Sequence, residues 1–152
     1  MAQSSVVHST FVIERSYPRA PGRVFDAFSD PAKKRRWYGE GEESELELFE
    51  MDFRVGGIER TRRRSREGLA FTNDTVYRDI VPNQRIVLAY NMSVGEKRIS
   101  SSLATMEFLA TQMGTSLIFT EQAAFFEGAD GPKIREEGWR ALFERLARDL
   151  EQ

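Results

Sequence analysis

A long stretch of strand-like sequence followed by a single amphipathic helix constrains most strongly what this chain can fold into. Between residues 44 and 126 the sequence alternates as β-strands do, and its breaks carry turn residues such as VGG, REG, VPNQ, SVGE and TQMG. The predicted strands span residues 44–51, 57–66, 71–81, 84–92, 97–109 and 115–126. Connections this short predict that successive strands are antiparallel neighbours.

The C-terminal segment changes to the period of a helix. Its apolar residues fall on one helical face and are Trp139, Leu142, Phe143, Leu146 and Leu150. Near the start, residues 9–17 predict a further strand, and Pro21 and Pro31 each suit the first turn of a short helix. The chain is therefore predicted to form an α+β fold, in which a curved seven-stranded antiparallel sheet wraps around the long helix. Sheet curvature leaves a space against the helix where a ligand would sit.

Composition excludes several classes of function. With 22 basic and 24 acidic residues the net charge is −2, which argues against a dedicated nucleic-acid binder. The absence of cysteine removes disulfides and thiolate chemistry and fits a reducing compartment. The N-terminus lacks the layout of a signal peptide, and no apolar run approaches a membrane span. We expect a cytoplasmic single domain over residues 1–152, monomeric or homodimeric, with residues 1–8 as a flexible tail.

Several segments, in this order, resemble the START-like helix-grip superfamily (SRPBCC), and more narrowly the homologues of the activator of the heat-shock-protein-90 ATPase. The segments are PRAPGRVFDAFSDPAKKRRWYG, DFRVGGIER, YRDIVPNQRIVLAY, GTSLIFTEQ and EGWRALFERLARDL. The resemblance implies the helix-grip fold, with two short helices after the first strand. It also implies a cavity for lipids, polyketides, hormones or other hydrophobic molecules, and some members are cyclases or aromatases.

The double glycine at Gly56 and Gly57 predicts a tight turn with a positive φ between two strands. In the strand that follows, one face carries arginines at positions 60, 62, 64 and 66. A hairpin about Val55 would set Glu45 and Glu47 opposite the arginines at 64 and 62. We therefore interpret this arginine face as salt-bridged and solvated rather than as a nucleic-acid patch.

The opposite face of the same strand carries Glu59, Thr61 and Arg63, which would point into the cavity. Three interpretations stay open: ligand binding, an internal Glu59–Arg63 pair, or a bulge that turns both charges outward. Glu121 raises a similar question because its face of the last strand is otherwise apolar. A carboxylate there should be paired, touch a ligand or have a raised pKa, and its expected partner is Arg63.

Tyr90, Trp37 and Tyr38 are the expected aromatic walls of the cavity, whereas a turn or strand end explains Asn73 equally well. His8 is the only histidine, which excludes Ser-His-Asp catalysis and histidine zinc sites, and we expect no metal and no cofactor.

The sequence thus predicts a cavity for a small hydrophobic or aromatic molecule with a polar or anionic group, bound by Glu59, Arg63 and Glu121. One alternative is a cyclase-like enzyme in which Glu121 or Glu59 acts as general base and Arg63 or Tyr90 stabilises an oxyanion. A second alternative is a protein-interaction module that uses the outer charged face.

Overall fold

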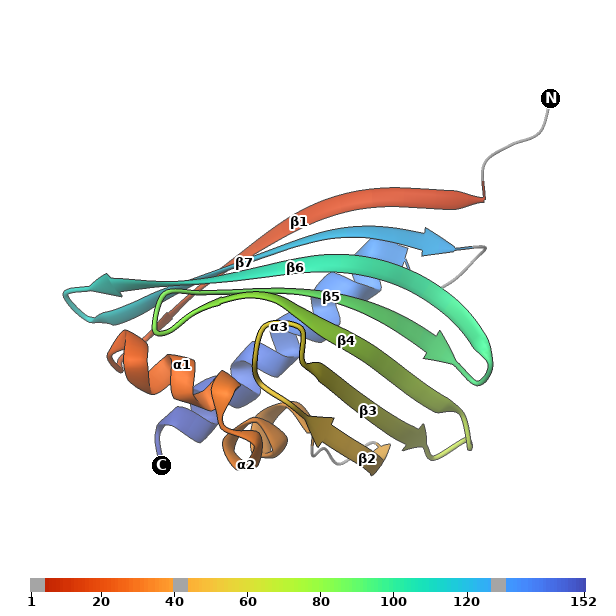
Figure 1. Cartoon of the computed structure of the whole chain (residues 1–152), viewed down its shortest axis with the longest axis horizontal. Coiled ribbons are helices and arrows are strands. Elements are labelled where there is room, and N and C mark those ends of the chain that lie inside the picture. The colour runs from red at the N-terminus through yellow and green to blue at the C-terminus, as the bar shows by residue number, and fades with distance from the viewer. Residues whose placement is uncertain (1–4, 40–43, 127–130) are drawn as a thin grey trace.

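A computed structural model describes residues 5–39, 44–126 and 131–152. Its strands form one antiparallel sheet in the order β1-β7-β6-β5-β4-β3-β2 (Figure 1). They are β1 (Val6–Tyr17), β2 (Ser44–Met51), β3 (Ile58–Ser65), β4 (Ala70–Val81), β5 (Arg85–Val94), β6 (Lys97–Thr111) and β7 (Gly114–Phe126). Each strand from β2 to β7 pairs with the next along the chain, while β1 pairs with β7.

The helical segments are α1 (Pro21–Ser29), α2 (Pro31–Lys34), the π-helix η1 (Arg35–Gly39) and α3 (Gly131–Leu150). Both short α-helices begin at a proline, as predicted. Asp30 caps α2 because its side chain accepts hydrogen bonds from the backbone N–H groups of Ala32 (2.9 Å) and Lys33 (3.4 Å). Figure 1 shows α3 running diagonally across the curved sheet. The predicted helix-grip α+β fold is confirmed.

The N-terminal strand is longer than predicted. It begins at Val6 rather than at residue 9, and His8 pairs with Ala124 of β7. The prediction of a flexible tail is therefore wrong for residues 6–8, because β-branched residues there extend the pairing to the end of β7. Residues 1–4 of the predicted tail lie outside the described part of the chain.

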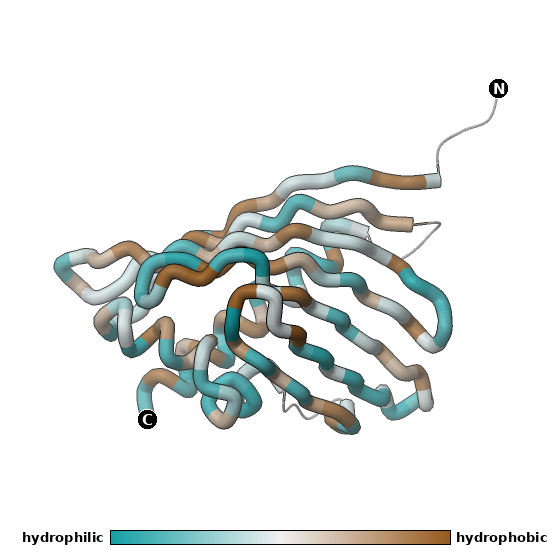
Figure 2. Tube along the Cα trace, viewed as in Figure 1, coloured by the Kyte–Doolittle hydropathy of each residue, from teal (hydrophilic) through white to brown (hydrophobic). Residues whose placement is uncertain are grey.

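The apolar stripe of α3 is packed against the sheet. Trp139, Phe143, Leu146 and Leu150 are buried, and the ring of Trp139 lies 4.5 Å from that of Phe119 on β7. Figure 2 shows that apolar and polar residues alternate along the strands, whereas β3 is hydrophilic along almost its whole length. The core therefore sits between the sheet and α3, and β3 brings polar groups to its edge.

The double-glycine turn joins β2 to β3 as predicted, and Gly56 has a φ of 84°. A Cβ atom on Gly57 would lie 2.0 Å from the carbonyl oxygen of Asp52, so this position accepts only glycine. The turn is tied to β4, because the N–H of Gly56 donates to the carbonyl of Tyr77 (2.8 Å) and the N–H of Tyr77 donates to that of Gly57 (3.0 Å).

The outer arginine face is salt-bridged, as predicted. Arg60 pairs with Asp74 (2.6 Å), and Glu47 pairs with Arg64 (2.8 Å) and more distantly with Arg62 (3.6 Å). The predicted register holds where Glu45 lies opposite Arg64. It is wrong at Glu47, because a bulge between residues 46 and 48 removes Glu47 from the pairing and leaves it within reach of both arginines.

Candidate functional site

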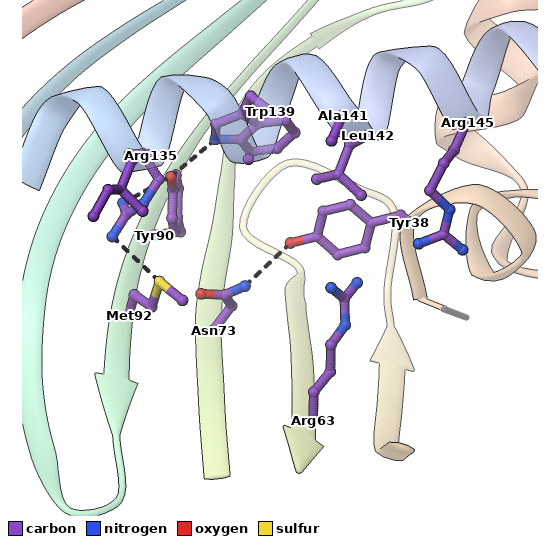
Figure 3. A pocket seen from close by; sticks show the side chains of 12 residues that line it. Tyr38, Arg63, Asn73, Tyr90, Met92, Arg135, Trp139, Ala141, Leu142 and Arg145 are labelled. Carbon is purple, nitrogen blue, oxygen red and sulfur yellow. Dashed lines mark hydrogen bonds between the residues drawn. The ribbon is translucent and has the colours of Figure 1, made fainter. Parts of the chain in front are cut away.

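A pocket of about 350 Å³ opens between the sheet and α3 (Figure 3). Strands β3, β4 and β5 provide one wall, α3 provides the other, and η1 contributes a tyrosine. The lining residues are Tyr38, Arg63, Asn73, Tyr90, Met92, Ile134, Arg135, Gly138, Trp139, Ala141, Leu142 and Arg145. Apolar and aromatic groups line most of it, so the few polar groups decide which ligand it accepts.

Arg63 points from β3 into this pocket, as the alternation of the strand predicts. Its guanidinium lies 5.4 Å from the ring centre of Tyr38. The Nε atom is buried and has no hydrogen-bond partner, and within the described ranges no carboxylate forms an ion pair with Arg63. A guanidinium held in a pocket without a counter-ion favours the binding of an anion.

Asn73 lies beside Arg63 on the neighbouring strand, since Asn73 pairs with Thr61 and Arg63 pairs with Phe71. Its Nδ2 donates a hydrogen bond to the hydroxyl oxygen of Tyr38 (3.3 Å), while its buried Oδ1 has no partner. Burial raises the pKa of Tyr38 to about 12, so the phenol is neutral and keeps its proton at physiological pH. The sequence did not single out Asn73 as a pocket residue, because an asparagine suits turns equally well.

Glu59 faces inward, but its partners differ from the predicted ones. It is almost fully buried, and it accepts two hydrogen bonds from Nζ of Lys34 (2.8 and 3.0 Å) and one from the hydroxyl of Tyr77. The proposed internal Glu59–Arg63 pair is therefore wrong, because the carboxylate of Glu59 is paired with Lys34 on α2 instead. Glu59 does not line the pocket.

Glu121 also faces inward, and its predicted pairing with Arg63 is wrong. Its carboxylate accepts hydrogen bonds from the hydroxyls of Tyr90 (2.7 Å) and Ser102 (3.2 Å) and lies 3.5 Å from NH1 of Arg135. Burial raises the pKa of Glu121, although Tyr90 and Arg135 oppose this shift. The carboxylate lies behind Tyr90 and is not among the lining groups.

Arg135 lines the pocket, although the sequence had not indicated it. It donates to the hydroxyl of Tyr90 (3.0 Å) and to Oγ of Ser100 (2.8 Å), so it ties α3 to the sheet. Its position four residues before Trp139 places it on the apolar stripe of α3. An arginine on the apolar face of the predicted helix could have indicated this position. Arg135 is the ion-pair partner of Glu121 on β7.

Of the predicted aromatic walls, Tyr38 and Tyr90 line the pocket, but Trp37 does not. Trp37 is buried in the core, where its Nε1 donates to the carbonyl of Ala27 (2.8 Å) and its ring packs against Phe28. The rings of these consecutive residues of η1 remain in contact, with centres 5.8 Å apart, but only Tyr38 reaches the pocket. The prediction that Trp37 is a wall of the cavity is therefore wrong, because its ring is part of the core.

Within residues 5–39, 44–126 and 131–152, no group of three histidine, aspartate or glutamate residues is placed to hold a metal ion. None of the helices in these ranges combines the length and the apolar character needed to cross a membrane.

Fold and pocket together define a helix-grip protein, in which sheet and long helix enclose a ligand-sized space. The chain belongs to the family described as activator of Hsp90 ATPase homolog 1-like proteins, whose model matches residues 18–151. The resemblance predicted from the sequence is thereby confirmed. Comparison with the curated proteins gives no match.

Solved structures agree with this assignment. A protein from Rhizobium leguminosarum is 41% identical, with a TM-score of 0.93 over 97% of both chains. A protein from Rhizobium loti is 49% identical, with a TM-score of 0.88 over 96% of this chain and 99% of that one. An AHSA1-like protein from Aeromonas hydrophila shares the fold at 17% identity, with a TM-score of 0.70 over 94% of this chain and 92% of that one.

Proposed function

We propose that the protein binds a small, largely apolar molecule that carries an anionic group, in the pocket between the sheet and α3. The observation that carries this proposal is Arg63, whose guanidinium lies in the pocket with a buried Nε that has no hydrogen-bond partner. A buried polar group without a partner costs free energy, and an anionic ligand would supply the missing acceptor.

The size and walls of the pocket support the same ligand class. Its volume of about 350 Å³ lies at the lower end of the range of roughly 300–1,000 Å³ typical of small-molecule sites. Trp139 and Leu142 of α3 face Tyr38 and Met92 across it. Aromatic and thioether groups suit a flat apolar ligand, so an aromatic carboxylic acid of one or two rings matches both the charge and the walls.

Binding is favoured over catalysis by what lines the pocket. Among the lining residues of the described chain there is no carboxylate and no imidazole that could act as a general base. The hydroxyl of Tyr90 is already engaged, since it donates to Glu121 and accepts from Arg135 and Trp139. We therefore propose a carrier or sensor of the ligand, and we expect no turnover of it.

The test compares aromatic acids with their neutral amides by thermal unfolding and calorimetric titration. An acid present at about 100 times its dissociation constant should stabilise the wild type by roughly 2.7 kcal/mol. Arg63→Met should weaken acid binding by roughly 10- to 100-fold, because a hydrogen bond to a charged group contributes about 1.5–3 kcal/mol. Binding of the neutral amides should be weak in both proteins.

Arg62→Met is the matched control, because Arg62 lies on the same strand but faces outward toward Glu47. It should bind acids as the wild type does. Equal affinity for acids and amides, or equal loss in both variants, would contradict an anion site at Arg63.

A further inference from the structure

Two buried atoms without partners, of opposite hydrogen-bonding character, face the same pocket. Nε–H of Arg63 is a donor, and Oδ1 of Asn73 is an acceptor. Both side chains lie on adjacent strands in diagonal positions, which are about 7–8 Å apart at the backbone. Polar atoms buried in proteins are nearly always paired, so two exceptions at one site indicate a partner that the chain itself does not provide.

The orientation of Asn73 is fixed by its neighbour. Its Nδ2 is used by the hydroxyl oxygen of Tyr38, and Tyr38 is itself held against the core by the rings of Trp37 and Trp139. Oδ1 therefore stays directed away from Tyr38, toward the side of Met92, while Arg63 lies on the other side of the amide (Figure 3). A ligand that places its anionic group on Arg63 and extends along the pocket toward Met92 brings a more distant position of its apolar part next to this acceptor.

We propose that the ligand is a hydroxy acid, or another acid with an O–H or N–H donor, in which at least one atom of the apolar part separates the donor-bearing atom from the atom that bears the anionic group. This inference rests on the proposed function and deepens it, because the anion would pair with Arg63 while the separate donor satisfies Oδ1 of Asn73. A site built to accept a hydrogen bond discriminates against analogues that lack the donor, since its own polar atom then stays unpaired.

The test uses three acids that share the naphthoate ring and differ only at position 4, from which a hydroxyl cannot reach the acid's own carboxylate: 4-hydroxy-2-naphthoate, 4-methoxy-2-naphthoate and 2-naphthoate. Calorimetric titration of the wild type should show the hydroxy acid binding at least about tenfold more tightly than the other two. Asn73→Leu should remove this preference while leaving the affinity for 2-naphthoate within about threefold. If Asn73→Leu fails to fold, Asn73→Ser serves, because it shortens the acceptor and keeps a polar side chain.

Asn91→Leu is the control, because Asn91 pairs with Asp74 on the outward-facing register of β4 and β5. It should keep the hydroxyl preference. A methoxy acid that binds best would mean that Asn73 presents its amide N–H groups instead, and it would overturn the proposal. Equal binding of the three acids with retained dependence on Arg63 would also overturn it, yet leave the proposed function standing. No binding of any acid would overturn both.

Discussion

Glu121 is a buried carboxyl group whose ionisation is linked to the stability of the fold. Its carboxyl group is fully buried behind Tyr90, and burial raises its pKa above the ordinary value of 4.5. A raised pKa in the folded state means that folding favours the protonated carboxyl. The stability that this residue contributes is thus complete below about pH 4.5 and is lost as pH rises through the folded-state pKa.

Replacing Glu121 by glutamine should make the stability less dependent on pH. We expect the free energy of unfolding of Glu121→Gln, relative to wild type, to increase as pH rises from 4 to 8, because the variant has no carboxyl to ionise. Urea unfolding at several pH values measures this difference. A difference that stays constant, or that falls with pH, would contradict a raised pKa at Glu121.

Side-chain direction was predictable residue by residue, whereas partners were not. Glu59, Arg63 and Glu121 all face inward because strands alternate, and the hydrophobic pattern of the neighbouring positions fixes the register. The partners Lys34 and Arg135 come from helices and not from the sheet. Which cation reaches a buried carboxylate depends on how those helices dock, and strand periodicity contains no information about that.

Among the elements, α2 and β3 are joined by a buried ion pair. Lys34 and Glu59 are both nearly inaccessible to solvent, with side-chain exposures of 5% and 2%, and Nζ of Lys34 also lies 4.6 Å from the ring centre of Tyr38. This contact positions η1, and with it the tyrosine that lines the pocket. The pair therefore acts as a structural support of the site.

Removing one member of this pair should destabilise the fold strongly. We expect Lys34→Met and Glu59→Gln each to lower the free energy of unfolding by about 3–5 kcal/mol, because each leaves a buried charge without its partner. The double variant should lose much less than the sum, since both charges are gone and the glutamine can still accept from Tyr77. Urea unfolding of the four proteins gives the coupling energy.

The exposed pair Glu136–Arg140 on α3 offers the comparison, at 2.8 Å and four residues apart. Glu136→Gln should cost less than about 0.5 kcal/mol. Losses of similar size at Glu59 and Glu136 would show that burial does not strengthen the inner pair.

The helical elements were harder to predict than the strands. The sequence indicates a second short helix after Pro31, but a helix of ordinary period does not account for a π-helix at Arg35–Gly39. Within this wider turn Trp37 packs in the core, and Tyr38 reaches the pocket. Tertiary packing selects such a turn, so the pattern of residues alone does not reveal it.

For the whole molecule, the pairing of β1 with β7 governs how the fold assembles. Val6 lies opposite Phe126, so this contact closes nearly the whole chain, whereas β4 and β5 are joined by a short turn. Long-range pairing requires more loop closure and is slower to form. We expect pulsed hydrogen exchange during refolding to protect amides of β4 and β5 before those of β1. Simultaneous or earlier protection of β1 would contradict this order.

The same pairing has a consequence for the newly made chain at the ribosome. β1 is synthesised before its partner, so Phe11, Ile13 and Tyr17, which are buried in the finished fold, must wait in a nascent chain until β7 has emerged. Helix α3, which forms the second wall of the pocket, is synthesised after β7. The pocket is therefore complete only once α3 has been made and has docked, and a chain cut short before α3 has the sheet but lacks one wall of the pocket.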